Sequence, residues 1–318
     1  MPMAIGVDIG GTKVAFALID ERGRLYHTNR MSTQPATDTA ALLDRISEGI
    51  VEMLAKAGGD IVGIGIGSPG QVDPVSGTVR NAVNLGWTEV ALRDEIHRRL
   101  TVDVPIQVDK DANAGAVGEL YFGAARGHRD FVLLAIGTGL GGGCISDGKV
   151  VHGGSANALE VGHISLDVNG RLCKCGLHGC PEMYVSGLGL LAGLEAHREH
   201  YPDSPLARLE TPSTQAIVDA ARAQDRLALA IMHEAGQWLG TIMANCAALL
   251  NPTLFVIGGG LGYAAYDLLI DTAMSEMRIR TLRTTSEGVS FALSEVQDSA
   301  VGAASLVWHH QHLIERES

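Results

Sequence analysis

Basic residues are scarce in this chain. Lys and Arg together number 24 against 36 for Asp and Glu, which gives a formal net charge of -12. Proteins that bind nucleic acids or anionic membranes through non-specific charge need a basic surface, so this balance argues against both classes of partner. It does not exclude an anionic small ligand, because the backbone N–H groups of a glycine-rich loop bind phosphate even on an acidic protein.

Segments that predict export or membrane insertion are also missing. The first residues lack a basic region, a sustained apolar run and a small-residue cleavage site. No window approaches the ~20 consecutive apolar residues that a spanning helix needs. We therefore expect a cytoplasmic protein that does not bind a membrane.

Cysteine is limited to five residues, and three of them are clustered within one short segment. In a chain without a secretion signal, an odd and clustered set predicts metal binding and not a framework of disulfide bonds. Proline-rich linkers and low-complexity runs are absent as well. Because the chain has 318 residues, 46% of them hydrophobic, it is long enough for about two closely joined domains with packed cores.

The hydrophobic pattern that is present predicts a mixed α/β protein. Two apolar runs, residues 4–9 and 14–19, flank a Gly-Gly turn and predict a β-hairpin, and a third strand is expected near residues 24–30. Residues 39–56 and 226–250 have the spacing of helices. The segment FVLLAIGTGLGGGCISDGKVV repeats the order strand, glycine turn, strand, which indicates an internal duplication.

The first glycine turn carries a set of phosphate-binding groups. Asp8 ends the first strand, and Gly10, Gly11, Thr12 and Lys13 follow it. Glycines let backbone N–H groups approach phosphate oxygens, the Thr12 hydroxyl can donate, and the Asp8 carboxylate can hold the hydration shell of Mg²⁺. The alternative is an ordinary hairpin turn. The spacing of a Walker A loop is absent.

Two further glycine clusters also follow buried strands. Gly137, Thr138 and Gly139 begin a second phosphate-loop candidate, whereas Gly258, Gly259 and Gly260 suit close approach to a nucleobase or ribose. In this order the three clusters resemble the actin-like ATPase (ribonuclease H-like) fold of sugar kinases and chaperone ATPases. By themselves, each could be a tight turn.

A third motif contains metal-binding side chains. His163 is followed by Cys173, Cys175 and Cys180, and three thiolates with one imidazole make a complete tetrahedral zinc site. His178 is a rival ligand, but it stands between the cysteines, where its ring reaches the ion less easily. A site with four protein ligands leaves no open position, so we expect the zinc to be structural and not catalytic.

These motifs together resemble the signature of ROK-family sugar kinases, and bacterial ROK glucokinases above all. The resemblance rests on DIGGTK, ALEVGH and CKCGLHGCPE, with GIGSPGQVD, NLGW and GTGLGGG in the same order, and covers nearly the whole chain. It implies a kinase that transfers phosphate from ATP, with Mg²⁺, to a hexose, most simply glucose. ROK repressors carry an amino-terminal helix-turn-helix, for which the position of Asp8 leaves no room.

The resemblance also implies roles for individual residues. Asp111 ends a strand and enters a helix, a suitable place for a general base, and the resemblance assigns it that role; the alternative is a solvated helix cap. Sugar hydroxyls would be bound by the side chains or backbone of Gly70, Lys110, Asp111, Glu160, His163 and Glu182.

Lys110 departs from the family pattern, in which this residue is Asn. An ammonium donates but cannot accept, so it does not replace an amide in hydroxyl recognition. It either turns toward Asp109 or solvent, which we favour, or selects a different hydroxyl pattern or an acidic substituent. Other hexoses such as mannose or fructose, amino or N-acyl sugars and cyclitols are therefore alternative substrates. Independently of Lys110, the resemblance also allows polyphosphate as donor and a sugar sensor that has lost catalysis.

The expected architecture has two duplicated lobes around a cleft. A smaller lobe comprises residues 1–117, and a final helix at about 301–318 packs back on it. The larger lobe, residues 118–300, holds the zinc motif and the nucleotide. We expect a homo-oligomer, either a dimer or a tetramer.

Overall fold

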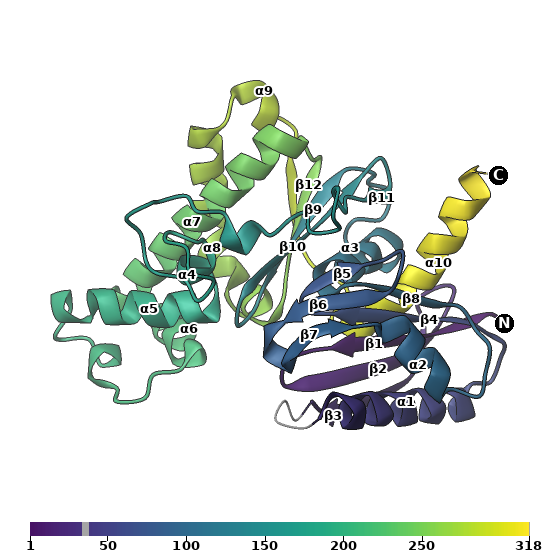
Figure 1. Cartoon of the computed structure of the whole chain (residues 1–318). Helices are drawn as coiled ribbons and strands as arrows, with labels where there is room; N and C mark the ends of the chain where they lie inside the picture. The colour runs from purple at the N-terminus through teal and green to yellow at the C-terminus, as the bar shows by residue number, and fades with distance from the viewer. Residues whose placement is uncertain (34–37, 318) are drawn as a thin grey trace. The chain divides into compact units, whose positions relative to one another are not determined.

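The computed structural model describes residues 1–33 and 38–317, with side chains up to residue 314 (Figure 1). The chain divides into two compact units. Unit 1 comprises Met1–Arg129, Gly143–Ala158 and Glu295–Ser318, and unit 2 comprises Asp130–Gly142 and Leu159–Ser294. In the described part of the chain, no helix combines the length and the apolar character needed to cross a membrane.

Unit 1 contains a five-stranded sheet with the order β3-β2-β1-β4-β8. Its strands are β1 (Met3–Ile9), β2 (Lys13–Asp20), β3 (Leu25–Ser32), β4 (Ile61–Ser68) and β8 (Ile106–Lys110). The first three are antiparallel neighbours, whereas β1, β4 and β8 run parallel. The carboxyl ends of β1, β4 and β8 therefore meet at one edge.

The two faces of this sheet differ in side-chain size because different helices cover them. Large apolar residues such as Ile5 and Val7 pack with helix α1 (Thr39–Lys56) in one core cluster, whereas Ala4, Ala15 and Ala17 pack against helix α10 (Ser299–Glu317) in another. The small residues let α10, yellow in Figure 1, approach the strands closely. A Cβ on Gly6 would lie 1.8 Å from the Ala300 carbonyl oxygen, so only glycine fits there.

The remaining elements of unit 1 connect or flank this sheet. A small three-stranded sheet has the order β5-β6-β7. These elements are β5 (Gln71–Asp73), β6 (Thr78–Ala82), η1 (Val83–Leu85), β7 (Trp87–Val90), α2 (Leu92–Arg99), α3 (Asp111–Phe122) and β11 (Lys149–Val150).

A second five-stranded sheet has the order β11-β10-β9-β12-β13, with β9, β12 and β13 parallel. Its further strands are β9 (Phe131–Ile136), β10 (Leu140–Ser146), β12 (Leu254–Gly258) and β13 (Ser290–Leu293). Both sheets have the same strand order: three strands that are consecutive in sequence lie side by side, and two later strands follow the first of them in parallel. The duplication expected from the sequence is therefore confirmed.

The helices of unit 2 pack mainly around the long helix α7 (Arg226–Leu250), whose buried face contains small residues such as Gly236 and Gly240 that admit helix α8 (Gly260–Arg280). The other helices are η2 (Val161–His163), α4 (Glu182–Val185), α5 (Gly187–His197), η3 (Arg198–His200), η4 (Leu206–Arg208), α6 (Thr214–Arg222) and α9 (Arg283–Ser286).

Candidate active site

Asp8 and Asp111 lie at the same edge of the unit 1 sheet. Asp8 pairs with Gly67 on β4, and Gly67 pairs with Asp109 on β8. A Cβ on Gly67 would lie 3.5 Å both from the Oδ1 atom of Asp8 and from the Cα atom of Asp111. Two carboxylates that are about 100 residues apart in sequence are thereby brought to either side of one glycine, where ligands commonly bind in α/β sheets.

Asp8 is held by the first residue of α10. The Ser299 hydroxyl donates to the Oδ2 atom of Asp8. Burial raises the pKa of the Asp8 carboxyl, while the Ser299 hydrogen bond and the charge of Lys13 oppose that rise. A cation near a buried carboxylate favours its ionised form, so this environment suits a carboxylate that works beside Mg²⁺.

The turn after β1 is fixed by Thr33, a residue that the sequence did not single out. The Thr33 hydroxyl donates to the Gly10 carbonyl oxygen at 2.7 Å, and its N–H donates to the Thr12 carbonyl oxygen at 3.0 Å. The Gly10 N–H donates to Lys13 across the turn at 2.9 Å. The side chains of Thr12 and Lys13 remain exposed, as a phosphate-binding loop requires.

Asp111 is exposed at the first position of α3, and its Oδ1 atom accepts from the Ala112 N–H at 2.6 Å. The preceding Lys110, which was expected to turn toward Asp109 or solvent, is directed to a backbone carbonyl oxygen. Lys110 is only 6% exposed, and its ammonium donates a hydrogen bond to the Ala158 carbonyl oxygen at 2.9 Å. Ala158 belongs to a segment of unit 1 that also contacts Asp109, the residue before Lys110 on β8, through His152.

Asp109, also buried, accepts three hydrogen bonds at the end of β8. Its Oδ1 atom accepts from the Lys110 N–H at 2.7 Å and from the Asn113 amide at 2.8 Å, and its Oδ2 atom lies 2.7 Å from the His152 Nε2 atom. Burial alone would lower the pKa of His152, but the adjacent Asp109 carboxylate outweighs burial and raises it. The pairing joins positions 43 residues apart, so no local sequence pattern could have revealed it.

In unit 2, the second and third glycine clusters lie together at the ends of the parallel strands β9 and β12. Gly259 has a φ of 80°, and a Cβ there would lie 2.4 Å from the Ile136 carbonyl oxygen. The two loops can touch in this way only because this residue is glycine. No neighbouring atom within 4 Å would meet a Cβ on Gly137 or Gly260, so space is open above both.

The loop after β9 is also bonded to the segment that follows the cysteines. The Glu182 carboxylate accepts from the Leu140 N–H at 3.0 Å, and the Gly187 N–H donates to the Gly137 carbonyl oxygen at 2.8 Å. Glu182, expected to bind a sugar hydroxyl, thus has a second contact that the sequence did not reveal. It connects the second glycine loop to the start of α4.

The structure gathers His163 with Cys173, Cys175 and Cys180. One ligand atom from each residue lies within 4.8 Å of all the others. The Cys173 Sγ and His163 Nδ1 atoms are 3.7 Å apart, and the Sγ atoms of Cys175 and Cys180 are 3.6 Å apart. A tetrahedral zinc ion with Zn–S bonds of about 2.3 Å separates its ligands by roughly these distances, so the donor set fits zinc.

His178, the rival ligand, is directed elsewhere. Its Nδ1 atom lies 2.9 Å from the Gly170 carbonyl oxygen, and the residue forms a bridge with Leu172. Its ring therefore supports the fold of the cysteine loop from outside the cluster.

Side chains on both sides of the cysteine loop attach it to α7. Arg171 forms a two-point ion pair with Glu234, with N–O distances of 3.0 and 2.8 Å. Tyr184 stacks on Trp238 with ring centroids 3.7 Å apart, and the Arg171 guanidinium lies 4.3 Å from the Tyr184 centroid. These contacts give the loop a rigid support apart from the metal ligands.

The other residues expected to bind sugar have defined places. Gly70 lies in unit 1 between β4 and β5 with a φ of 91°, which glycine adopts most readily. Glu160 directly precedes η2 in unit 2, and its carbonyl oxygen accepts from the N–H of His163, the last residue of that helix, at 3.0 Å. Glu160 and His163 are therefore held on one turn, with His163 also in the cysteine cluster.

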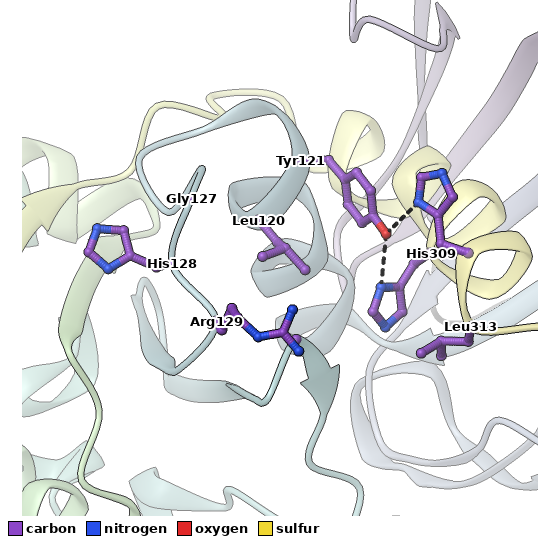
Figure 2. Close-up of a pocket in the computed structure, with 9 residues that line it drawn as sticks. Leu120, Tyr121, Gly127, His128, Arg129, His309 and Leu313 are labelled. Atoms are coloured by element: carbon purple, nitrogen blue, oxygen red, sulfur yellow. Dashed lines mark hydrogen bonds between the residues drawn. The ribbon is translucent and has the colours of Figure 1, made fainter. Parts of the chain in front are cut away.

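A separate cavity of about 610 Å³ lies in unit 1, and none of the predicted site residues line it (Figure 2). There the Tyr121 hydroxyl lies 3.4 Å from the Nδ1 atom of His309 and 3.0 Å from that of His312. Burial lowers the pKa of His309 to about 4. Within the described residues, the His309 Nε2 atom has no hydrogen-bond partner.

Comparison with known proteins agrees with this arrangement. The ROK family pattern matches residues 4–310. A glucokinase from Streptomyces coelicolor is 37% identical over 278 residues, which cover 85% of this chain and 86% of that protein. The crystal structure of a ROK family glucokinase from Streptomyces griseus, in complex with glucose and AMPPNP, is 33% identical, has a TM-score of 0.81, and matches over 96% of this chain and 98% of its own.

Regulators of the same family are similar too. A ROK family transcriptional regulator, a homolog of the E. coli MLC protein, has a TM-score of 0.88 at 26% identity, covering 99% of this chain and 80% of its own. The resemblance inferred from the motifs is therefore confirmed, and the chain belongs to the ROK family.

Proposed function

We propose that this protein is an ATP-dependent sugar kinase that converts glucose to glucose 6-phosphate. Its relatives in Streptomyces coelicolor and Streptomyces griseus are glucokinases, and the latter binds glucose and AMPPNP. The observation that carries the proposal is the position of Asp8 and Asp111 beside Gly67 at one sheet edge. This edge supplies one carboxylate for the hydrated magnesium ion of ATP and one for the sugar hydroxyl.

Asp111 is the proposed general base. Its carboxylate accepts the proton of the sugar 6-hydroxyl as the oxygen attacks the γ-phosphorus, and the bond from that phosphorus to the β,γ-bridging oxygen breaks to release ADP. Positioning and neutralisation of charge supply most of the rate in phosphoryl transfer. Its exposed place at the start of α3 leaves the carboxylate accessible to a hydroxyl.

The nucleotide and the sugar use the residues that the motifs indicate. We assign the ATP phosphates and nucleoside to Asp8, Gly10, Gly11, Thr12, Lys13, Gly137, Thr138, Gly139, Gly258, Gly259 and Gly260. We assign the sugar to Gly70, Asp111, Glu160, His163 and Glu182, with Lys110 adjoining them. Magnesium, bound with ATP, neutralises the phosphate charge.

Zinc in this proposal is structural. His163, Cys173, Cys175 and Cys180 would supply four protein ligands to the ion, a set that is typical of structural zinc sites. Bound there, the ion would order the segment between Glu160 and Glu182, two of the proposed sugar-binding residues. The closeness of the four donor atoms supports the assignment.

An ADP-release assay with a panel of sugars tests the function. We expect turnover with glucose and ATP, and weaker turnover with mannose, fructose and N-acyl sugars. The same panel with polyphosphate as donor, followed by the amount of sugar phosphate formed, tests the choice of ATP. No sugar phosphate with any sugar and either donor, from protein that contains its zinc, would reject the kinase. ATP is an intracellular donor, so a cytoplasmic location accompanies the proposal.

A sugar-sensing regulator is the second candidate, and its support is the likeness to a ROK transcriptional regulator. A sensor would bind glucose without consuming ATP. Calorimetry with glucose, run beside the ADP assay, separates the two: binding without turnover favours the sensor. Sedimentation of the same preparation tests the dimer or tetramer that we expect.

A further inference from the structure

Two consecutive residues of β8 hold both ends of one loop. Asp109 pairs with His152 at 2.7 Å, and Lys110 donates to the Ala158 carbonyl oxygen at 2.9 Å. The Ala158 N–H donates back to the His152 carbonyl oxygen at 3.0 Å, which closes residues 152–158 into a loop. We propose that Lys110 and His152 are positioning residues that fix this loop beside the proposed base Asp111, at the point where the chain continues toward the proposed sugar-binding residue Glu160.

The loop needs such support because its own backbone is strained. Ala156 has a φ of 59°, and Leu159, which directly follows the loop, has a φ of 64°; both carry a Cβ. Residues other than glycine, asparagine and aspartate rarely adopt this left-handed conformation, which persists only where surrounding contacts impose it. The His152 and Lys110 contacts hold the two ends of the loop, on either side of Ala156.

Burial makes the two contacts strong. Asp109 is 5% exposed and Lys110 6%. A buried ammonium or carboxylate is costly unless it is paired and hydrogen-bonded, so neither side chain leaves its partner easily. The Asn113 amide holds the same Asp109 carboxylate at 2.8 Å from the first turn of α3. The His152 contact therefore acts on the helix that begins with Asp111.

The position of these contacts along the chain gives them a role in substrate recognition. Asp111 follows Lys110 directly, and Glu160 lies two residues beyond Ala158. Along the chain, this hydrogen bond thus joins the residue before the proposed base to a residue two positions before a proposed sugar-binding carboxylate. The role in substrate recognition rests on the proposed sugar kinase activity, whereas the loop contacts do not depend on that activity. Lys110 acts through the loop, in place of reading a sugar hydroxyl directly.

The test compares Lys110→Met with Lys110→Arg and His152→Ala with His152→Gln. Met removes the donor and keeps much of the length, whereas Arg and Gln keep a donor. We expect Lys110→Met and His152→Ala each to raise KM for glucose by about tenfold with a smaller change in kcat, since each loses a charge-assisted hydrogen bond. We expect Lys110→Arg and His152→Gln to recover part of the loss. Lys56→Met, an exposed lysine paired with Glu52 on α1, is the matched control.

Hydrogen exchange of residues 152–159 decides between positioning and direct contact. Faster exchange in Lys110→Met and His152→Ala without added sugar supports the inference. A raised KM with unchanged exchange would mean that Lys110 contacts the sugar itself and would overturn it, as would wild-type KM and exchange in both variants. If the wild-type protein phosphorylated no sugar, the kinase proposal would fail, and exchange in the same variants would still decide the loop contacts.

Discussion

The carboxylate of Glu182 accepts a hydrogen bond from the Leu140 backbone amide at 3.0 Å, and so joins the segment after the cysteines to the loop that follows β9. The Glu182 side chain is thereby connected with both proposed substrates. The loop at Gly137 is assigned to ATP, whereas Glu182 itself is assigned to the sugar.

Replacement of Glu182 should therefore affect both substrates. Glu182→Ala removes the acceptor for Leu140 and the sugar contact, so we expect KM to rise for glucose and for ATP. Glu182→Gln keeps a carbonyl oxygen for Leu140, so the rise should be confined largely to glucose, at about tenfold. Steady-state kinetics with each substrate varied will show the difference. Equal effects of the two variants on ATP would contradict a role of Glu182 in holding the loop.

Asp111→Asn should abolish most turnover and spare glucose binding. Loss of a general base typically lowers kcat by ~10²–10⁴-fold, and the amide keeps the size of the side chain. Single-turnover ADP release measures the first effect and calorimetry with glucose the second. A variant with nearly normal kcat would show that another group removes the proton.

Purified protein should contain about one zinc ion per chain, because the four donors form one complete site. Cys175→Ser should lower both the zinc content and the melting temperature, since metal binding is coupled to folding of the loop. His178→Gln is the matched control, because His178 is directed to Gly170. Elemental analysis and thermal melting measure both variants. Loss of zinc in His178→Gln would identify that residue as the ligand in place of His163.

His309 should make the protein sensitive to acid. In the folded protein the pKa of His309 is about 4, below its ordinary value of 6.5. The neutral imidazole therefore contributes fully to the free energy of unfolding above pH 6.5, and this contribution is lost as the pH falls toward 4. Between pH of about 7.5 and 5 this single group should remove about 2 kcal/mol from the free energy of unfolding. Urea unfolding of His309→Gln should show a correspondingly smaller pH dependence. His310→Gln, an exposed neighbour, should behave as wild type.

Local pattern was sufficient for much of the fold. The helices expected at residues 39–56 and 226–250 are α1 and α7 with the same bounds, because their apolar residues recur at three and four positions. The helix α8 was missed, although Leu261, Ala265, Leu269, Ala273 and Met277 are buried at every fourth position. The boundary expected near residue 117 falls within α3, whereas unit 1 continues to Arg129 and also contains two later segments of the chain.

The candidate site was predictable where chemistry is encoded in short motifs. Glycine clusters and closely spaced cysteines have few structural alternatives, and their members lie together as their spacing indicates. The direction of Lys110 was not predictable. It depends on a carbonyl oxygen 48 residues further along the chain. Because every residue type has a backbone carbonyl, the sequence does not indicate which one accepts.

The stacking of Tyr184 on Trp238 gives the cysteine loop a natural optical reporter. Of the three tryptophans, Trp87 and Trp308 belong to unit 1, so Trp238 is the indole of unit 2. It stacks on the ring of Tyr184, four positions after the last proposed metal ligand, and the Arg171 guanidinium contacts that same ring. An indole held in this way emits differently from one released into water. The intrinsic fluorescence of the protein therefore records whether this loop is ordered, without any label or substrate.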